Sequence, residues 1–337
     1  MLTSIRRFAA VCRWQRLRRY PELGLLAFSL SVVLVGRAFG LPLSPPDLRA
    51  GEAILHDYLL PLSITAMVHL VLLIRSRVRR GSSGVILALS IPTLFVVTYC
   101  HFQCKLWMPL VNPHRFDGVY YSIGHSVAGV VTLCVWLTRL MMRTGVSISA
   151  AYDGWFIALF FVCFGLHTLY DTTTGQRQVI LGVGWILALG GICYWIAPAV
   201  GPFIFRHGAS SNASFIQRYM WRNFNLLADT RRIPPGYFLA PPAAMPSLHI
   251  AHAAFFIWML RRISRRLSYL FMPLLLWFMI TSVGLAWHYV VDIPAGLLLA
   301  AVAVLLVTRM LPDQEPRKET EPLFAEHAPV KDLVPAE

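Results

Sequence analysis

Residues 289–310 read YVVDIPAGLLLAAVAVLLVTRM, an apolar run with one acidic residue near its start and one basic residue near its end. As a helix, these 22 residues would rise about 33 Å, which is enough to cross the hydrocarbon core of a bilayer. The segment therefore predicts a transmembrane helix. Eight further runs of similar character precede it, approximately at residues 22–40, 59–74, 84–102, 119–138, 154–170, 179–205, 246–260 and 269–287.

The composition indicates a chain whose surface faces lipid more than water. Hydrophobic residues make up 57% of the 337 residues, and charged residues only 14%. Ordinary soluble domains contain about 25% charged residues. The sequence therefore predicts an all-α, polytopic transmembrane helical bundle.

The net charge of +14 is concentrated in arginine clusters beside the apolar runs. A basic cluster is compatible with nucleic-acid binding, but short Arg-rich loops beside spans mark the cytoplasmic face of membrane proteins. We therefore predict no nucleic-acid partner and contacts with anionic lipid headgroups. The clusters are Arg6, Arg7, Arg13, Arg16, Arg18 and Arg19 before the first run, Arg75, Arg77, Arg79 and Arg80 after the second, and Arg261, Arg262, Arg265 and Arg266 after the seventh.

The basic loops do not all agree on one topology. Arg139 and Arg143 follow the fourth run, and three further crossings would separate them from the Arg261–Arg266 loop. Either one segment does not fully cross, or Arg139 and Arg143 lie on the outer face. We give the Arg261–Arg266 loop more weight because it holds four arginines in six residues. On that choice the C-terminal tail is cytoplasmic, and the start of the 246–260 run faces outward.

The cysteines and histidines do not form a recognisable disulfide or metal pattern. The six cysteines include no CxxC pair, and most lie within the apolar runs, which argues against a disulfide framework or a zinc module. His252 lies one turn after His249, but structural zinc usually takes thiolates or a tighter histidine cluster. We therefore predict no metal and no cofactor.

His288 and Asp292 place two ionisable groups beside an apolar run. Such groups are costly in a membrane and are therefore functional candidates. With a spacing of four residues on a helix, the carboxylate can fix the imidazole tautomer and stabilise a cationic or phosphorylated ring, as a nucleophilic histidine requires. The alternative is a structural pair at a helix end, which is how we interpret His167 and Asp171.

A second segment, MPSLHIAH at residues 245–252, begins another span. Pro246 favours a helix start, and Ser247 could cap that helix or donate to a ligand oxygen. A helix N-terminus beside a hydroxyl can bind an anion, and His249 could protonate a leaving oxygen. The alternative is a capped helix with an interfacial histidine. If this span and the next form an antiparallel hairpin, His249 and His288 meet at one membrane surface.

The two segments together resemble the second and third signature motifs of the type-2 phosphatidic acid phosphatase superfamily. Their Pro-Ser-x-His and His-x-x-x-Asp patterns carry the resemblance, and YWIAPAVGP at residues 194–202 is similar to a segment of the inositol phosphorylceramide synthase branch. The resemblance implies a six-helix membrane core. It also implies that His288 is a nucleophile forming a phosphohistidine, that Asp292 orients it, and that His249 is the general acid.

The motifs leave the phosphate-binding cation unassigned. We find no Lys/Arg-rich first motif that ends in Arg-Pro, and Thr281 and Ser282 stand where the superfamily has Ser-Arg. We therefore predict that phosphate is bound by Ser247 and by arginines of the 206–244 loop, namely Arg206, Arg231 and Arg232.

We predict three parts in the chain. Residues 1–118 form a basic segment and accessory transmembrane helices, and residues 119–311 form the six-helix catalytic core with an outward-facing loop at 206–244. Residues 312–337 form a disordered cytoplasmic tail. We expect an integral protein of a bacterial inner membrane whose active site faces outward.

The predicted reaction acts on a membrane lipid substrate. We expect a lipid phosphotransferase of the inositol phosphorylceramide synthase-like type, which moves a phosphoryl or phospho-headgroup to an alcohol or inositol acceptor. Water as acceptor would instead give a lipid phosphate or polyprenyl (pyro)phosphate phosphatase, depending on how well the pocket excludes water. A non-enzymatic transporter or scaffold is a second alternative, although a transporter would need polar groups at mid-depth in several spans.

Overall fold

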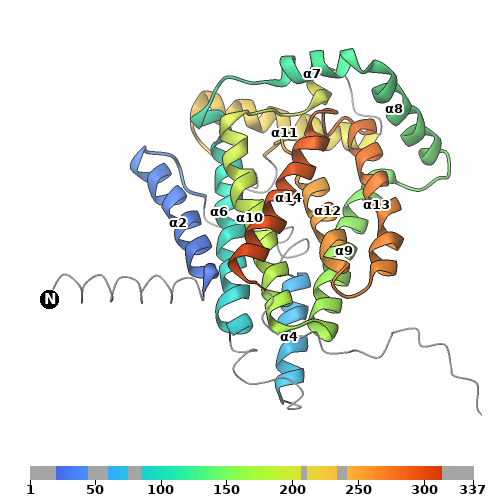
Figure 1. Cartoon of the computed structure of the whole chain (residues 1–337). Helices are drawn as coiled ribbons and strands as arrows, with labels where there is room; N and C mark the ends of the chain where they lie inside the picture. The colour runs from blue at the N-terminus through green and yellow to red at the C-terminus, as the bar shows by residue number, and fades with distance from the viewer. Residues whose placement is uncertain (1–19, 45–59, 75–84, 206–210, 234–240, 313–337) are drawn as a thin grey trace, which may run out of the picture.

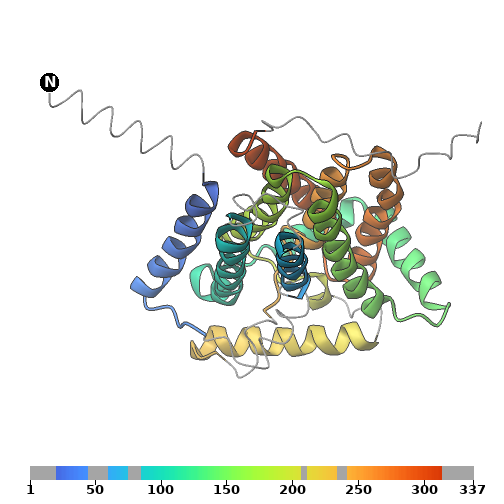
Figure 2. The same cartoon turned by 90° about the horizontal axis from the view of Figure 1, so that it is seen from below.

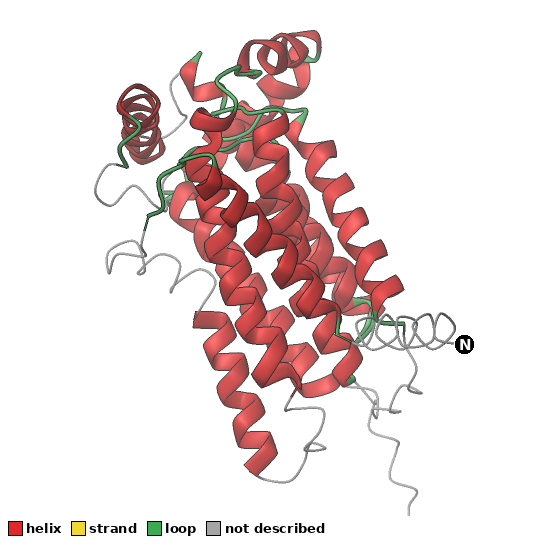
Figure 3. Ribbon diagram, turned by 90° about the vertical axis from the view of Figure 1, so that its left-hand side faces the viewer, coloured by secondary structure: helices red, strands yellow, loops and turns green. Residues whose placement is uncertain are grey.

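The computed structural model describes residues 20–44, 60–74, 85–205, 211–233 and 241–312. Within these ranges every regular element is a helix (Figure 1, Figure 3), which confirms the predicted all-α membrane bundle. The elements are α2 (Pro21–Ala38), α4 (Leu60–Ile74), η2 (Ile86–Ser90), α6 (Ile91–Val111), α7 (Asp117–Ser126), α8 (Ala128–Met142), α9 (Ile148–Tyr170), α10 (Thr173–Ile196), η3 (Pro202–Ile204), α11 (Ser211–Thr230), α12 (Leu248–Leu260), α13 (Arg265–Gly284) and α14 (Asp292–Met310).

Five of these helices are long and apolar enough to cross a membrane, namely α2, α9, α10, α13 and α14. The bent pair of α7 and α8 gives a sixth if it counts as one span. The described residues therefore hold fewer full-length spans than the nine that the hydropathy predicts. The apolar helix α12 has only 13 residues and rises about 20 Å, which is less than the hydrocarbon core. Helix α10 ends at Ile196, before Pro198 and Pro202, which cannot continue a helix.

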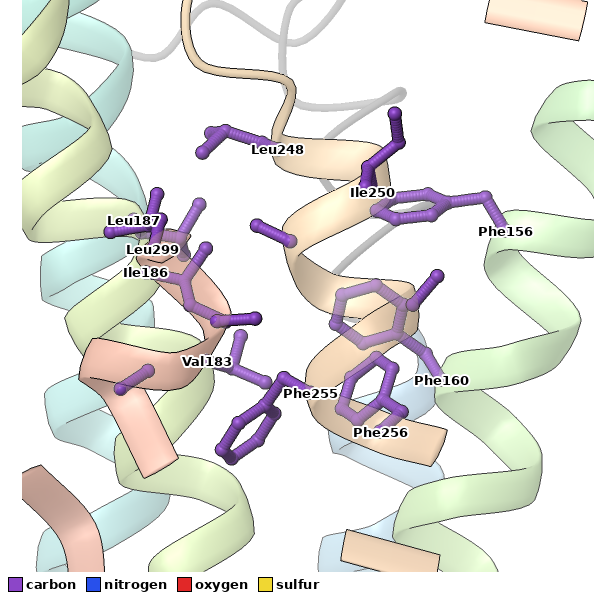
Figure 4. Close-up of a cluster of buried hydrophobic side chains, with 14 of the residues drawn as sticks. Phe156, Phe160, Val183, Ile186, Leu187, Leu248, Ile250, Phe255, Phe256 and Leu299 are labelled. Atoms are coloured by element: carbon purple, nitrogen blue, oxygen red, sulfur yellow. The ribbon is translucent and has the colours of Figure 1, made fainter. Parts of the chain in front are cut away.

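Helix α10 forms the centre of the bundle and packs against α2, α6, α9, α12 and α14. Small residues permit this close approach: a Cβ atom at Gly190 would lie 2.6 Å from Leu248 Cδ2, and one at Gly182 would overlap the ring of Phe255. Figure 4 shows α12 between α10 on one side and α9 on the other, with Phe255 and Phe256 filling the interior. This tight packing fixes where α12 begins.

Helices α7 and α8 form a bent pair at one end of the bundle, not a straight span over residues 119–138 (Figure 1). The two helices are bent by 93° relative to each other. The pair begins at Asp117, whose carboxylate accepts a hydrogen bond of 2.8 Å from the hydroxyl of Tyr289. It ends at Met142, which packs in a cluster with Leu285 at the end of α13. Both ends of the pair therefore lie at the same end of the bundle, which we call the His288 end.

This arrangement resolves the conflict between the basic loops. Because the α7–α8 pair begins and ends at the His288 end, the exposed Arg139 and Arg143 lie there too. The Arg261–Arg266 loop joins α12 to α13 at the opposite end. Helices α9, α10 and α12 then lead the chain three times from one end of the bundle to the other between the two basic loops. The structure thus supports the alternative in which Arg139 and Arg143 lie on the other face.

Helix α11 lies crosswise on the bundle, within the 206–244 stretch predicted as a loop (Figure 2). Its buried residues recur at the spacing of an amphipathic helix, namely Ala213, Gln217, Phe224 and Leu227. The Nε2 atom of Gln217 donates to the carbonyl oxygen of Leu285 over 2.9 Å. This hydrogen bond fastens α11 to the His288 end.

The opposite end of the bundle is held by buried ion pairs. Arg177 of α10 binds Glu22 of α2 through two hydrogen bonds of 2.8 Å, from its Nε and Nη2 atoms. Glu22 is fully buried and also accepts a hydrogen bond of 2.8 Å from the hydroxyl of Ser90. A bidentate guanidinium–carboxylate pair restricts geometry strongly, so it fixes α2 against α10.

A second cluster joins α9 to the turn between α12 and α13. Asp171 Oδ2 accepts hydrogen bonds from Nδ1 of His167 at 2.6 Å and from Nε of Arg262 at 3.1 Å. Burial raises the pKa of Asp171, but the hydrogen bonds and charges of His167 and Arg262 outweigh it and lower the pKa to about 2. These contacts agree with a helix-end network.

Candidate active site

His288 lies in the connection between α13 and α14, not on one helix with Asp292, which is the first residue of α14. The spacing of four residues still brings the two side chains together. His288 Nδ1 donates to Asp292 Oδ2 at 3.2 Å and to the carbonyl oxygen of Ala244 at 2.8 Å. Because both partners are acceptors, the proton of the neutral ring lies on Nδ1, and Nε2 keeps its lone pair. This tautomer suits a nucleophile.

Asp292 is held by the same connection. Its side chain is fully buried, and its Oδ2 accepts a hydrogen bond of 2.8 Å from the amide of Tyr289. Its Oδ1 has no hydrogen-bond partner in the part of the chain that the structure describes. One carboxylate oxygen thus orients the imidazole of His288, while the other makes no hydrogen bond within the described ranges.

Asp117 is a buried residue of the site that the sequence analysis did not assign. Its carboxylate accepts hydrogen bonds from the amides of Val200 and Gly201, both at 2.9 Å, and from the Tyr289 hydroxyl. Burial and the charge of Asp117 raise the pKa of Tyr289 well above its usual value, so the phenol stays protonated and donates. Asp117 therefore ties the start of α7 and the segment after α10 to the connection that carries His288.

Gly201 allows this close approach. Its φ of +134° lies in the region that favours glycine, and a Cβ atom there would lie 2.9 Å from the carbonyl oxygen of Trp287. The conformation places the YWIAPAVGP segment directly against the residue that precedes His288.

Ser247 and His249 begin α12 at the same end of the bundle. Ser247 is fully buried and makes no side-chain cap, and its hydroxyl has no hydrogen-bond partner among the described residues. A buried, unpaired hydroxyl is costly, so it is suited to bind a ligand oxygen. The ring centroid of His249 lies 6.5 Å from that of His288. Two imidazoles at this separation can contact one phosphoryl group from two sides.

A pocket of about 190 Å³ lies beside His288. The α7–α8 pair forms one wall, and the connection between α13 and α14 forms another. Its polar lining includes Tyr121, His125, Thr132 and His288, and its apolar lining includes Val131 and Val283. The sequence analysis assigned no role to His125, because the bend that brings α7 over His288 is not visible in the hydropathy.

Two of the three arginines predicted to bind phosphate lie in the described part of the chain, and neither contacts the site residues by a hydrogen bond there. Arg231 and Arg232 follow α11, and both are exposed. Neither has a hydrogen bond to His249, His288 or Asp292 within the described ranges. Arg206 lies outside the described residues. The phosphate-binding role of these arginines stays a prediction.

Lys105 of α6 is a cation near the site that the sequence analysis missed. Its Nζ atom lies 6.0 Å from the ring centroid of Tyr194 and 5.7 Å from that of Phe102, inside the bundle. A lysine in an apolar span is costly and marks a functional candidate, so the sequence does carry this signal. The segment that begins at Lys105 ends with Asn112-Pro113, so it does not match a motif that ends in Arg-Pro.

Comparison with known families finds a match over the C-terminal part of the chain. The model of the PAP2 superfamily matches residues 133–306, slightly more than half of the 337 residues. The matched segment contains His249, His288 and Asp292. No curated protein and no solved structure matches the chain. With its apolar, membrane-length helices, the chain is an integral membrane protein, and it belongs to the PAP2 (type-2 phosphatidic acid phosphatase) superfamily, whose members are phosphatases and phosphotransferases.

Proposed function

We propose that the chain is a lipid phosphotransferase of the inositol phosphorylceramide synthase-like type, which acts through a phosphohistidine. Membership of the superfamily supports the broader statement that it is a phosphatase or phosphotransferase. The observation that supports a phosphohistidine is the pairing of two histidines whose surroundings differ. His288 has its Nδ1 proton held by two acceptors, and His249 lies 6.5 Å away between ring centroids.

The first step forms the covalent intermediate. Nε2 of His288 attacks the phosphorus of a lipid phosphate, so an N–P bond forms and the bond from phosphorus to the leaving oxygen breaks. His249 gives its proton to that leaving oxygen. Asp292 stabilises the positive charge that develops on the ring of His288, since its Oδ2 accepts the Nδ1 proton.

The second step releases the group from the enzyme. A hydroxyl of the acceptor attacks phosphorus, the N–P bond breaks, and the proton of the hydroxyl passes to His249. An alcohol or inositol as acceptor gives a transferase, whereas water gives a phosphatase. The equatorial oxygens of the transferred group carry negative charge throughout. We propose that the buried hydroxyl of Ser247 and the ammonium of Lys105, a cation inside the bundle, bind them.

The site end is opposite the Arg261–Arg266 loop. Under the positive-inside rule that loop is cytoplasmic, and the proposed active site then faces outward. The predicted bacterial inner membrane stays a prediction.

The decisive experiment traps the intermediate. Purified full-length protein would be incubated with ³²P-labelled phosphatidic acid, phosphatidylinositol and polyprenyl phosphate, with and without inositol or a lipid alcohol, and quenched in alkali, in which phosphohistidine is stable. We expect an alkali-stable label on the protein, and its loss in His288→Ala together with a fall in turnover of at least about 10³-fold. His167→Ala is the matched control because it removes a buried histidine of the same spacing from the other end.

Each product identifies one outcome. A new phosphodiester supports the transferase, and free phosphate alone supports the phosphatase alternative. A protein that takes no label and turns over no lipid would contradict the enzymatic proposal and leave the transporter or scaffold reading.

A further inference from the structure

The ring of His249 is held differently from that of His288. Nδ1 of His288 has two hydrogen-bond acceptors, whereas the ring of His249 packs against two aromatic rings of α9. The ring centroids of Tyr152 and Phe156 lie 4.8 Å and 4.3 Å from its own. Packing against rings restricts the plane of an imidazole, but it does not decide which nitrogen carries the proton.

Tyr152 carries a hydroxyl that has no hydrogen-bond partner in the described part of the chain. The residue is only 3% exposed, and its ring also contacts Phe278 and Trp277 of α13, at 5.3 Å and 6.1 Å between centroids. A buried hydroxyl without a partner is costly, and phenylalanine would fill nearly the same space without that cost. Of the neighbouring rings, only the imidazole of His249 can both release and take up a proton. The hydroxyl therefore points to a role at His249.

The start of α9 brings Tyr152 to the depth of His249. Ser147 caps this helix, because its hydroxyl oxygen accepts a hydrogen bond of 3.4 Å from the amide of Ala150. Tyr152 then lies in the second turn of α9, and His249 is the second residue of α12. The two helices pack against each other, and Figure 4 shows Phe156 of α9 directed toward the first turns of α12.

The proposed reaction uses one nitrogen of His249 twice. In the first step this nitrogen gives a proton to the leaving oxygen, and in the second step it takes the proton of the acceptor hydroxyl. A neutral imidazole has one N–H and one bare nitrogen, so the other nitrogen must keep its proton throughout. A hydrogen-bond acceptor at that other nitrogen fixes the tautomer, as Asp292 does for His288.

We infer that the Tyr152 hydroxyl is this acceptor and that Tyr152 is a positioning residue for His249. The inference rests on the proposed function, since it concerns the general acid of that reaction. In the working enzyme the hydroxyl oxygen accepts the N–H of His249 that does not face phosphorus. The bare nitrogen of the neutral ring then faces the acceptor hydroxyl. Tyr152 keeps its own proton, so the leaving oxygen takes its proton from His249, and the acceptor hydroxyl returns one to the same nitrogen.

The test combines substitutions of Tyr152 and His249. Purified full-length wild type, Tyr152→Phe, His249→Ala and the double variant would be incubated with the three ³²P-labelled lipids of the trapping experiment, and kcat and KM would be measured for each lipid that is turned over. Tyr152→Phe keeps the ring and removes only the hydroxyl, so kcat should fall about 10- to 100-fold while KM stays within about twofold. In the His249→Ala background the same substitution should change kcat less than about twofold, because Tyr152 acts through the imidazole.

Thermal unfolding separates this role from packing. Tyr152→Phe removes a hydroxyl without a partner among the described residues, so its melting temperature should equal or exceed that of the wild type. Tyr99→Phe of α6 is the matched control. The Tyr99 hydroxyl donates to the carbonyl oxygen of Ser44 over 2.9 Å, so we expect a lower melting temperature and an unchanged kcat.

The outcomes distinguish this inference from the proposed function. A kcat of Tyr152→Phe within about twofold of the wild type, or the same loss of kcat in both backgrounds, would overturn the positioning role. A melting temperature that falls together with kcat would assign Tyr152 to packing and overturn it too. In these cases His288→Ala would still abolish the label. A wild type that takes no label and turns over no lipid, or turnover that survives His288→Ala, would instead overturn the proposed function.

Discussion

Two pairs with the pattern His-x-x-x-Asp lie at opposite ends of this bundle, and their surroundings differ. At His167 and Asp171 the imidazole and the carboxylate are 2.6 Å apart, and Arg262 binds the same carboxylate oxygen at 3.1 Å. At His288 and Asp292 the distance is 3.2 Å, and no ion pair from lysine or arginine reaches Asp292 among the described residues.

This difference indicates which features distinguish a catalytic His–Asp pair from a structural one. The guanidinium of Arg262 balances the charge of Asp171, so this carboxylate is less able to stabilise a positive charge on His167. Asp292 has one carboxylate oxygen without a hydrogen-bond partner among the described residues. Its partner His288 lines a pocket, and the ring centroid of His288 lies 6.5 Å from that of His249. Lys105, the cation that we propose for phosphate binding, lies on a different helix, α6. Spacing alone therefore does not distinguish a structural pair from a catalytic one.

The largest effect on turnover should come from substitution of Asp292, with the same substitution of Asp171 as the comparison. In Asp292→Asn the amide group can donate to Nδ1 of His288, which favours the wrong tautomer, and kcat should fall about 10²- to 10⁴-fold. In Asp171→Asn we expect kcat to stay within about twofold while the melting temperature falls. The measurements are lipid turnover and thermal unfolding of both proteins in the same detergent. Equal losses of turnover in the two variants would show that the pairs are equivalent.

The next effect concerns Lys105, which forms no ion pair with Asp292 among the described residues. Lys105→Met keeps a long apolar side chain and removes the charge, so kcat/KM should fall about 10- to 100-fold if the ammonium stabilises the phosphoryl oxygens. Steady-state assays across lipid concentrations would separate kcat from KM. Arg231→Met, at an exposed position, is the matched comparison. A larger loss in that variant would assign phosphate binding to the arginine predicted from the sequence.

Much of the fold could be predicted from hydropathy, and the reasons are local. The runs that became α2, α9, α13 and α14 are long and apolar, and a helix is the conformation that satisfies their backbone in lipid. His249, His288 and Asp292 are visible because ionisable groups at the edges of such runs are unusual. Their meeting at one end followed from a short hairpin between α12 and α13, which the structure contains.

The remainder depends on tertiary contacts that no local pattern records. The bend between α7 and α8 has no proline at its break, Val127, so hydropathy predicts one straight span. Its position is set by the distant hydrogen bonds of Asp117, to Gly201 and Tyr289. The pocket that His125 lines exists only once this bend is formed. Likewise, the 211–230 segment has low hydropathy, and its helix is stabilised where its apolar side packs on the bundle.

A smaller effect would test whether α7 positions the catalytic connection. Tyr289→Phe removes one hydrogen bond, from the Tyr289 hydroxyl to Asp117, and should lower kcat about 10-fold with little change in KM, because Tyr289 also donates its amide to Asp292. Asp117→Asn should have a similar effect, and the double variant should be no worse than the single ones. Strictly additive losses, or a change confined to KM, would show that this hydrogen bond does not act on His288.

The last effect concerns stability, not turnover, and is a pH dependence that comes from the pair at His167 and Asp171. The pKa of Asp171 is about 2 in the folded protein and about 3.9 in an unfolded chain. The ionised form is thus favoured by folding, so this contribution is present above about pH 4 and lost as the pH falls toward 2. It corresponds to about 2–3 kcal/mol. Thermal unfolding in a non-ionic detergent at pH 6, 4 and 2.5 would measure it.

The variant Asp171→Asn isolates this contribution from the titration of other carboxylates. The gap between the melting temperatures of the wild type and the variant should be widest at pH 6 and should narrow at pH 2.5, where Asp171 begins to take up a proton. A gap that is constant with pH would mean that the carboxylate is not held by charge. Arg262→Met should reproduce the variant, because it removes the cation that distinguishes this pair from His288 and Asp292.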